Sequence, residues 1–511
     1  MNKVATVLAY HTRSKHSLDR YAAGPGTLDW EAQPKAFRDW TGTQQIALPR
    51  DVVVSEISWS DLSDARSSAP LNIADLGSLL RLCAGLTAWK EYAGSRWSLR
   101  AHPSSGNLHP TETWLIASGV AGLEDGLYHY QNLHHALERR AWGSAAQESG
   151  LWLGFSSIHW REAWKYGERA FRYCQLDLGH VLAAVCYAAS LHGWRVRLLT
   201  IDSASVANCL GLDRKADFSG VEGEEPEVIV ALEAAGSSEV PPTNWQHWAG
   251  KPDLLDARPL YQWPVIEEVA QATRGAPPRA DSMAVADCAH KHEGGIRAAQ
   301  VILKRRSAQA FDGQSVMPNA VFRQMLTSLL PGGSPVWNMW PHTARVHPVL
   351  MVHRVEGVAP GLYAMPRSEA ARASLQTAFR DTFTWQPAAP ELSLFQLVCA
   401  RAGKIARTLS CHQDIASQCA VTFMMVAEFA EPISSDPAAY RHLHWETGML
   451  GHVITLVAEA AGWRGTGIGC FFDDADHEVL GLKDDHFQVI YHYAAGMALD
   501  DPRISTLPAY D

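Results

Sequence analysis

The sequence is poor in charged residues for its length. Asp, Glu, Lys and Arg make up 19% of 511 residues, below the ~25% of an average soluble protein, whereas apolar residues make up 47%. Intrinsic disorder needs low hydrophobicity and high charge, so this composition excludes a disordered chain. The length alone allows two or three domains, because single domains commonly reach ~200–250 residues.

Two kinds of segment are missing. There is no dense Lys/Arg run and the net charge is −10, which makes nucleic acid a poor candidate partner. The longest apolar runs fall short of the ~18 residues of a membrane span, and the first residues lack the apolar stretch of a signal peptide. We therefore expect neither a nucleic-acid partner nor a membrane segment.

The nine cysteines form no CxxC pair. An odd number scattered along a long chain favours reduced thiols in the cytoplasm, most of them small core residues. The cluster Cys288-Ala-His290-Lys-His292-Glu293 contains metal-ligand types, but its spacing matches no standard zinc pattern. We expect no metal site.

What the sequence does contain is a long internal repeat. Phe171–Gly179 aligns with Tyr440–Gly448, and the alignment continues without a gap to Trp194 and Trp463, always 269 residues apart. Apolar residues at three- and four-residue spacing predict a helix in both stretches. Shorter matches flank them: Gly126-Leu-Tyr128 with Gly361-Leu-Tyr363, His109-Pro110 with His347-Pro348, and Leu210-Gly-Leu212 with Leu480-Gly-Leu482. The period is too long for a solenoid and predicts two copies of one domain.

The copies are expected at residues 1–235, with an N-terminal extension, and at residues 284–511. Residues 236–283 are rich in Pro, Gly and Ser, which is typical of a linker. Its middle, Leu260–Gln271, has apolar groups that could pack on a domain. Each copy mixes short β-like runs with long helices, which predicts an α+β fold.

Two strings suit an anionic, flat ligand. Pro103-Ser104-Ser105-Gly106-Asn107 precedes a β-like run and offers hydroxyl, amide and backbone donors. A simple turn before a strand is the alternative. Arg305-Arg306-Ser307 suits a phosphate, because Arg supplies a planar fork of donors. A solvated basic helix end is the alternative there.

Two further strings are weaker alone. Gly465-Thr466-Gly467-Ile468-Gly469 is a glycine-rich loop that would bring main chain against a flat ligand, without the context of a dinucleotide-binding fingerprint. Lys165-Tyr166 places two proton-transfer groups on an otherwise apolar segment. For the Lys165-Tyr166 string, the alternative is a surface turn that leads into a helix.

Together the four strings resemble the FMN-dependent nitroreductase superfamily, specifically its SagB/ThcOx-type dehydrogenase branch. PSSGNLHPTE, KYGERAFRY followed by GH, and RRS followed by Phe311 carry the resemblance, and with the repeat it covers nearly the whole chain. It implies a duplicated nitroreductase-like fold, with mixed, mainly antiparallel sheets flanked by helices, and FMN at the interface of two subunits. The FMN-binding residues it implies are Arg100, Pro103, Ser104, Ser105, Asn107, Arg305, Arg306, Ser307, Gln309, Gly465, Thr466, Gly467, Ile468 and Gly469.

The implied residues are divided between the copies. The PSSGN string lies in copy 1, whereas the RRS and glycine strings lie in copy 2. Their counterparts in the opposite copies differ: Pro335–Arg345 is rich in Trp, Arg195–Asp202 lacks glycine, and Arg66–Leu71 lacks the RRS string. We therefore expect an intramolecular pseudo-dimer, compatible with a monomeric chain, that has one FMN site. Trp337 and Trp340 are expected to fill the lost second site.

The sequence also departs from the family pattern. Gln309 stands where the family usually has a second Arg, so one partner of the phosphate is missing. Arg503 could replace it, since family members often use a late basic residue, or it could be an exposed tail charge. Lys165 and Tyr166 match the Lys-Tyr pair that the resemblance implicates in proton abstraction.

The resemblance implies an FMN-dependent dehydrogenase acting on a peptide-derived or natural-product heterocycle, with O2 or another acceptor reoxidising the flavin. An NAD(P)H-dependent nitro- or quinone reductase is one alternative, and a non-catalytic partner in a biosynthetic complex is another.

Several side chains are interpreted as structural more readily than functional, namely His180, His452, Asp473, Asp474 and the Cys411–Asp414 segment. His11, Lys15 and His16 could cover a site or be exposed.

Overall fold

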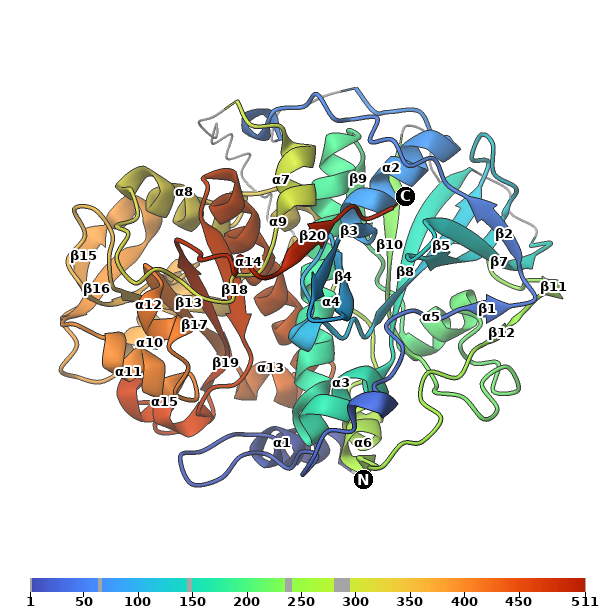
Figure 1. The fold of residues 1–511 in the computed structure, drawn as a ribbon. Coiled ribbons are helices and arrows are strands. Elements are labelled where there is room, and N and C mark those ends of the chain that lie inside the picture. Colours follow the sequence, from blue (N-terminus) through green and yellow to red (C-terminus); the bar gives the residue numbers. More distant parts are fainter. Residues whose placement is uncertain (1, 63–66, 145–148, 235–240, 280–294, 511) are drawn as a thin grey trace.

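The computed structural model describes residues 2–62, 67–144, 149–234, 241–279 and 295–510. In these residues the chain forms two large sheets, one in each half (Figure 1). The first has the order β11-β7-β6-β5-β8-β10-β9, with β2 also on β7, and the second has the order β15-β16-β14-β13-β17-β19-β18. The central strands correspond one to one, which confirms the duplicated α+β fold.

All strand pairs in these two sheets are antiparallel. The first sheet consists of β2 (Gln44–Ala47), β5 (Thr111–Ser118), β6 (Gly126–Gln131), β7 (Ala136–Trp142), β8 (Gly150–Ser157), β9 (Arg195–Leu198), β10 (Glu225–Glu233) and β11 (His247–Trp248). The second consists of β13 (Val346–Val352), β14 (Gly361–Ala364), β15 (Gln386–Ala389), β16 (Leu394–Cys399), β17 (Val421–Glu428), β18 (Arg464–Ile468) and β19 (Phe487–Gly496).

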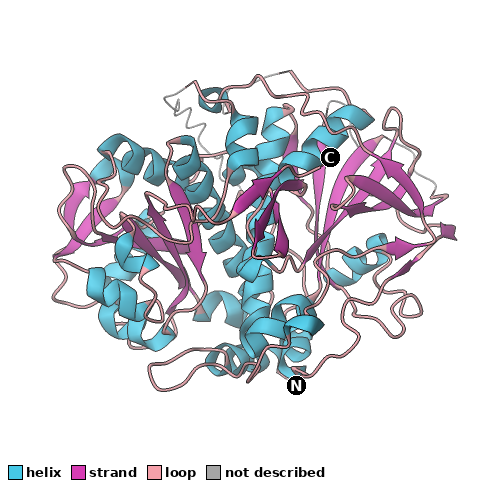
Figure 2. Cartoon of the chain, in the orientation of Figure 1, coloured by secondary structure: helices cyan, strands magenta, loops and turns pink. Residues whose placement is uncertain are grey.

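Helices fill the middle of the molecule, between the two groups of strands (Figure 2). The helices of the first half and of the connecting segment are α1 (Lys3–Arg13), α2 (Ile73–Cys83), α3 (His159–Tyr166), α4 (Ala170–Leu191), α5 (Ser203–Leu210) and α6 (Pro264–Ala272). Those of the second half are α7 (Ala298–Lys304), α8 (Asn319–Leu329), α9 (Val336–Met339), α10 (Glu369–Ala378), α11 (Gly403–Leu409), α12 (Ile415–Gln418), α13 (Ala430–Ser435), α14 (Ala439–Ala460) and α15 (Asp473–Leu480).

The two repeated helices, α4 and α14, pack against each other at the centre. They meet at equivalent glycines: a Cβ on Gly179 would lie 2.3 Å from the carbonyl oxygen of Trp445, and one on Gly448 would lie 2.1 Å from that of Leu176. Only glycine lets two helix backbones approach this closely. The repeat therefore encodes the contact that joins the halves.

Each end of the chain packs on the opposite half. Near the C-terminus, β20 (Ser505–Leu507) pairs with β3 (Leu86–Tyr92), which pairs with β4 (Ser95–Arg100). The Tyr510 hydroxyl donates to the Asn132 carbonyl at 3.0 Å. At the other end, Lys15 forms an ion pair with Asp474 at 2.8 Å. These exchanged arms tie the halves together in addition to the central helices.

The segment expected as a linker is largely ordered on the first half. Strand β11 lies at the edge of the first sheet, and β12 (Lys251–Pro252) pairs with β1 (Trp40–Thr41). Ile266, Val269 and Ala270 of α6 are buried, and α6 packs on α1 and α4. The apolar groups in the middle of this segment therefore contribute to the core.

A buried ionic network fixes α3 to the first sheet. His129 lies 2.8 Å from carboxylate oxygens of both Glu112 and Glu138. Burial alone would lower the pKa of His129, but its hydrogen bonds to the two carboxylates raise that pKa to about 9. Arg161 of α3 pairs with Glu112 and donates to the His109 carbonyl at 2.8 Å. The network thus holds α3 beside the loop that precedes β5.

One continuous helical stretch, residues 159–191, is long and apolar enough to cross a membrane by length and composition. Its most apolar window is 94% buried inside the protein. A core helix of a globular protein has these same properties, and the burial favours that interpretation.

Candidate functional site

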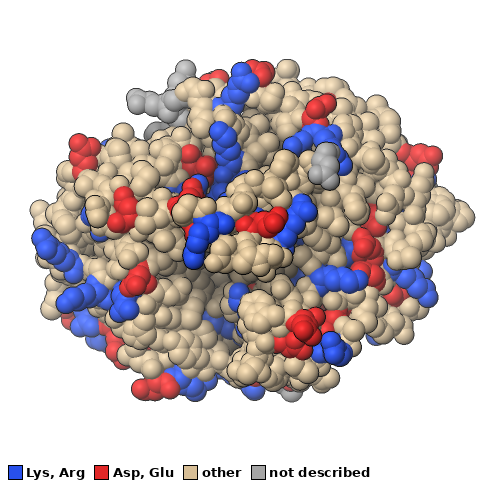
Figure 3. All heavy atoms as spheres, in the orientation of Figure 1, with Lys and Arg blue, Asp and Glu red and all other residues tan. Residues whose placement is uncertain are grey.

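A cavity of about 840 Å³ lies between the two halves. Its walls come from β3, β4 and the Pro103–Asn107 loop of the first half, and from the Arg305–Gln309 segment and β18 of the second. Figure 3 shows the surface hollowed near the middle of this face, with basic and acidic side chains side by side along its upper edge. Neither half forms this cavity alone.

The loop Pro103–Asn107 is held by Asp177 of α4. The Asp177 carboxylate accepts hydrogen bonds from the Ser104 hydroxyl at 2.6 Å, the Ser105 backbone N–H at 3.0 Å and the Ser105 hydroxyl at 2.9 Å. Burial raises the pKa of Asp177 to about 7, against the serine hydrogen bonds, which lower it. Gly106 and Asn107 have φ of 58° and 60°, so the loop turns sharply where it borders the cavity.

The equivalent position in α14 is Glu446, which holds a different structure. Its carboxylate pairs with Arg367 and accepts the backbone N–H of Arg345. Helix α9 precedes Arg345 in the chain and packs against β9 and α4. Trp337 and Trp340 of this segment are 2% and 5% exposed. Bulky buried side chains thus occupy the region related by the repeat to the Pro103–Asn107 loop.

The sequence predicted that the glycine string is a loop. In the structure most of it forms edge strand β18, which is antiparallel to β19. Its glycines are needed for close contacts: a Cβ on Gly467 would lie 1.7 Å from the Tyr491 hydroxyl oxygen. The Gly469 carbonyl accepts the Tyr173 hydroxyl at 3.1 Å. Thr466, Gly467, Ile468 and Gly469 form one cavity wall.

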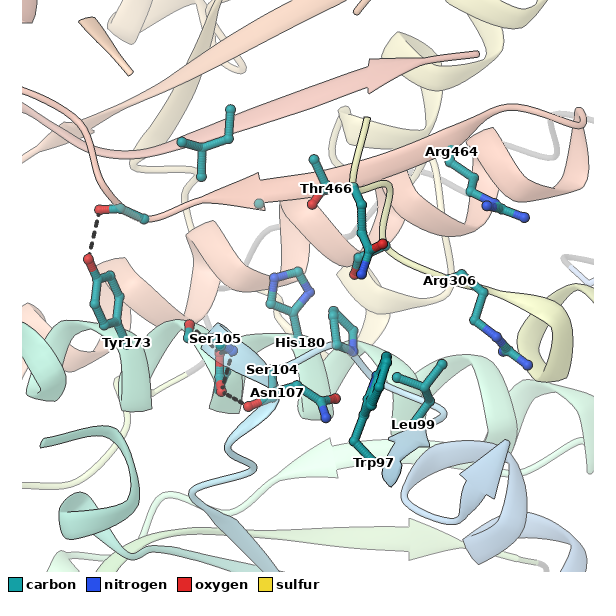
Figure 4. A pocket seen from close by; sticks show the side chains of 18 of the residues that line it. Trp97, Leu99, Ser104, Ser105, Asn107, Tyr173, His180, Arg306, Arg464 and Thr466 are labelled. Atoms are coloured by element: carbon teal, nitrogen blue, oxygen red, sulfur yellow. Dashed lines mark hydrogen bonds between the residues drawn. The ribbon is translucent and has the colours of Figure 1, made fainter. Parts of the chain in front are cut away.

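Basic side chains gather at one end of the cavity. Arg305 is buried and donates to the carbonyls of Ala101 and Arg100, both at 3.0 Å, so it also fastens the second half to the first. Arg306 donates to the Thr87 hydroxyl at 3.2 Å. Figure 4 shows Arg306 and Arg464 at the same end, with Tyr173 at the other and His180 between.

Lys90 lines the same basic end of the cavity as Arg306 and Arg464. It donates to the Thr506 hydroxyl at 2.7 Å. Burial lowers its pKa, and the positive charge of Arg306 lowers it further. Arg464 pairs with Asp500, but within the described residues neither Lys90 nor Arg306 forms an ion pair with a carboxylate. An anion bound here would relieve the repulsion between the two cations.

The expected cofactor residues divide into two groups. The structure brings together Arg100, Pro103, Ser104, Ser105, Asn107, Arg305, Arg306, Ser307, Gln309, Thr466, Gly467, Ile468 and Gly469, all around this cavity. The structure does not place Gly465 among the residues that line the cavity, and a Cβ there would lie 2.9 Å from the Tyr493 ring. Nor does it bring Arg503 to the cavity: that side chain is 68% exposed and pairs with Asp501 at 2.7 Å. Lys90 and Arg464 line this end of the cavity instead.

Lys165 and Tyr166 end α3 beside the Pro103–Asn107 loop. A Cβ on Gly106 would lie 2.5 Å from the Tyr166 hydroxyl oxygen and 3.2 Å from Lys165 Nζ. Tyr166 lines the cavity, and its ring packs edge-on to Tyr173 with 4.7 Å between centroids. Burial raises the Tyr166 pKa well above its usual value. Tyr166 is therefore a neutral hydroxyl at neutral pH, able to donate a hydrogen bond into the cavity.

Several lining residues were not expected from the sequence. His180 borders the cavity, burial lowers its pKa to about 3, and its Nδ1 has no hydrogen-bond partner in the structure. The cavity is also lined by Lys90, Trp97, Tyr173, Asp177, Arg464 and Tyr491, and by His16, Cys411 and Gln413. Isolated residues of this kind carry no local sequence signal.

Some sequence candidates lie elsewhere. The Cys288–Glu293 cluster and Arg66 fall outside the described residues. Within the described ranges, no group of three or more potential ligand residues is placed to hold a metal ion. Asp473 begins α15 and pairs with Arg169 at 2.9 Å and Arg172 at 2.6 Å, a buried contact between the halves.

Residues 302–497 match the model of the nitroreductase family. Over 120 residues it is 35% identical to the trifolitoxin-processing protein TfxB of Rhizobium leguminosarum bv. trifolii, a match that covers 20% of this chain and 32% of TfxB. Over 170 residues it is 26% identical to a protein of Methanocaldococcus jannaschii provisionally named a nitroreductase, covering 30% of this chain and 81% of that protein.

The whole fold has a solved counterpart. A crystal structure from Anabaena variabilis ATCC 29413, of a protein provisionally named a nitroreductase, superposes with a TM-score of 0.71 at 21% identity. The superposition covers 97% of this chain and 99% of that one. The double-domain arrangement therefore exists as a complete fold in another chain.

Proposed function

We propose that the chain is an FMN-dependent oxidoreductase that binds one FMN in the cavity between its two halves. The observation that carries the proposal is the cavity itself. Its basic end has two cations, Lys90 and Arg306, that form no ion pair with any described carboxylate. Its walls are a serine-rich loop from one half and a glycine-rich edge strand from the other.

The donor set fits the groups of FMN. Lys90, Arg306 and Ser307 suit a phosphate, because cationic and hydroxyl donors bind phosphate oxygens well. Gly467 and Gly469 line the cavity without side chains of their own, which brings main chain close to a flat ring system. The volume of about 840 Å³ is within the range of ligand sites, ~300–1,000 Å³. When bound, FMN would supply hydride-acceptor chemistry.

The protein's own side chains would position the substrate and move its proton. Tyr166 lines the cavity and Lys165 Nζ lies over the Tyr166 ring, 5.4 Å from its centroid. We infer that this pair serves the proton transfer: the neutral Tyr166 hydroxyl donates a hydrogen bond to the substrate, and the free-amine form of Lys165 accepts the proton that leaves the substrate carbon. Asp177 keeps the neighbouring loop in place through Ser104 and Ser105.

The substrate class we propose is a peptide-derived or natural-product heterocycle, converted by a SagB-type dehydrogenase. The support is the relative TfxB, which is named for processing trifolitoxin, together with the Lys165-Tyr166 pair. O2 or another acceptor would then reoxidise the flavin. We further propose that the protein acts in the cytoplasm, where its cysteines remain reduced.

The first test is optical. Protein purified in the presence of FMN should retain a flavin absorption spectrum that dithionite bleaches, with slow bleaching by NAD(P)H. Rapid bleaching by NAD(P)H would favour the reductase alternative, which the name of the M. jannaschii relative also suggests. Protein that takes up no FMN would overturn the proposal and favour a non-catalytic partner.

Lys165→Ala and Tyr166→Phe should each lower turnover of an identified substrate by about 10²–10⁴-fold, the usual contribution of a positioned proton-transfer group. The flavin spectrum should be unchanged in both variants, because neither side chain is placed to bind the phosphate. Turnover is measured under single-turnover conditions, by following flavin bleaching. Full turnover in both variants would show that the proton leaves by another route.

A further inference from the structure

The end of the cavity opposite the basic side chains contains two cysteines from different segments. Cys411 follows α11 and Cys470 follows β18, and both line the cavity and are partly exposed. The Cys411 and Cys470 side chains interact, and this interaction raises the pKa of Cys411 and lowers that of Cys470. Five of the other described cysteines are buried, and Cys399 is exposed at the end of β16.

The two cysteine-bearing segments are fixed to each other. The Gln413 side chain donates to the Ser410 carbonyl at 3.0 Å and to the Cys470 carbonyl at 3.1 Å. The Phe472 backbone N–H donates to the Leu409 carbonyl at 2.8 Å. These hydrogen bonds hold the backbone of the Cys411 segment against that of the Cys470 segment.

The backbone at Cys411 is strained. Cys411 and His412 have φ of 51° and 61°, a left-handed conformation that residues other than glycine adopt at a cost. A buried chain of contacts holds the preceding residue: the Ser410 hydroxyl lies 3.0 Å from His492 Nδ1, and His492 Nε2 lies 2.8 Å from Asp476. Strain of this kind persists only where neighbouring structure enforces it, and it is common at functional sites.

We propose that Cys411 and Cys470 form a thiol–disulfide exchange site whose substrates are small diffusible disulfides that enter the cavity. The site is independent of the oxidoreductase activity proposed above and requires no flavin. Cys470 is the attacking residue and Cys411 the resolving residue.

The surroundings of Cys470 favour its thiolate form. The interaction with Cys411 lowers the pKa of Cys470, against burial, which raises it, and the interaction with His16 lowers it further. The cation of Arg169 acts in the same direction. The same contact with Cys470 raises the pKa of Cys411. The thiolate is the nucleophile in disulfide exchange, so the two thiols have different roles.

The reaction balances without a further reagent. The Cys470 thiolate attacks one sulfur of the small disulfide, whose S–S bond breaks and releases one thiolate. That thiolate takes the Cys411 proton and leaves as a thiol. The Cys411 thiolate then attacks the Cys470 sulfur of the mixed disulfide, which forms the Cys411–Cys470 bond and releases the second thiolate. Two protein thiol groups are oxidised and one small disulfide is reduced.

The test is to incubate the full native chain with oxidised glutathione and to locate the products by peptide mass spectrometry. Wild type should give a Cys411–Cys470 linked peptide and lose two reactive thiols. Cys411→Ser should accumulate glutathione on Cys470, because the resolving thiol is missing, and Cys470→Ser should form no link. Cys399→Ser is the matched control and should behave like wild type.

Modification of Cys399 alone, with Cys411 and Cys470 still reduced, would overturn the proposal. So would glutathione on Cys411 in the Cys470→Ser variant at the wild-type rate, because it would make Cys411 the attacking residue. If a variant does not fold, the wild-type chain still decides: alkylation of the native protein with limiting iodoacetamide should label Cys470 before Cys399. Labelling in the reverse order would contradict the assignment.

Discussion

Arg306→Ala should weaken FMN binding by about 10- to 100-fold, which corresponds to the ~1.5–3 kcal/mol of a hydrogen bond to a charged group. Arg306 is half-buried at the basic end of the cavity and makes its hydrogen bonds to Thr87 and to backbone carbonyls. Its positive charge is therefore available for a phosphate. The affinity is measured by fluorescence titration of the apoprotein with FMN.

The matched control is Arg503→Ala. Arg503 lies on the same C-terminal arm that closes this end of the cavity, yet its side chain points to Asp501 and is 68% exposed. FMN affinity should be unchanged in this variant. Lys90→Ala should weaken binding in the same direction as Arg306→Ala. A loss in Arg503→Ala with none in Arg306→Ala would place the phosphate elsewhere.

Gly179→Leu should destabilise the protein by about 3 kcal/mol or more, at the upper end of the usual cost of overpacking a core. A side chain at Gly179 would meet the carbonyl oxygen of Trp445, a backbone atom that cannot rotate away. The helices α4 and α14 would have to separate. Because α4 carries Asp177 and Tyr173, we also expect FMN binding to be lost. Urea unfolding and FMN titration measure the two effects.

Gly223→Ala is the control for this substitution. A Cβ on Gly223 would meet no atom within 4 Å, so its unfolding midpoint should stay close to that of wild type. If Gly179→Leu unfolded at the wild-type urea concentration and still bound FMN, the crossing of α4 and α14 would not be what joins the halves of the site.

The fold was predictable from the sequence because the duplication is written in local patterns. The helix pair around Gly179 and Gly448 keeps one offset of 269 residues without a gap, and both helices begin and end at matching positions. The Pro103–Asn107 loop and the Arg305–Ser307 segment are continuous strings. Such strings can be identified without knowing how the chain folds.

The rest of the site could not be predicted, because it depends on contacts between distant segments. Lys90 lies on a strand of the first half and Arg464 on a strand of the second, and only the fold places both beside Arg306. Glycines at alternate positions resemble a loop, whereas here β18 pairs with β19 along its whole length. Cys411 and Cys470 meet for the same reason, through the packing of two loops.

The central claim is that two domain copies build one flavin site. It is tested most directly by saturating the apoprotein with FMN, removing free ligand, and measuring released flavin against protein concentration from amino-acid analysis. One FMN per chain is expected, because Trp337 and Trp340 are buried in the region related by the repeat to the Pro103–Asn107 loop. Two FMN per chain would contradict the account.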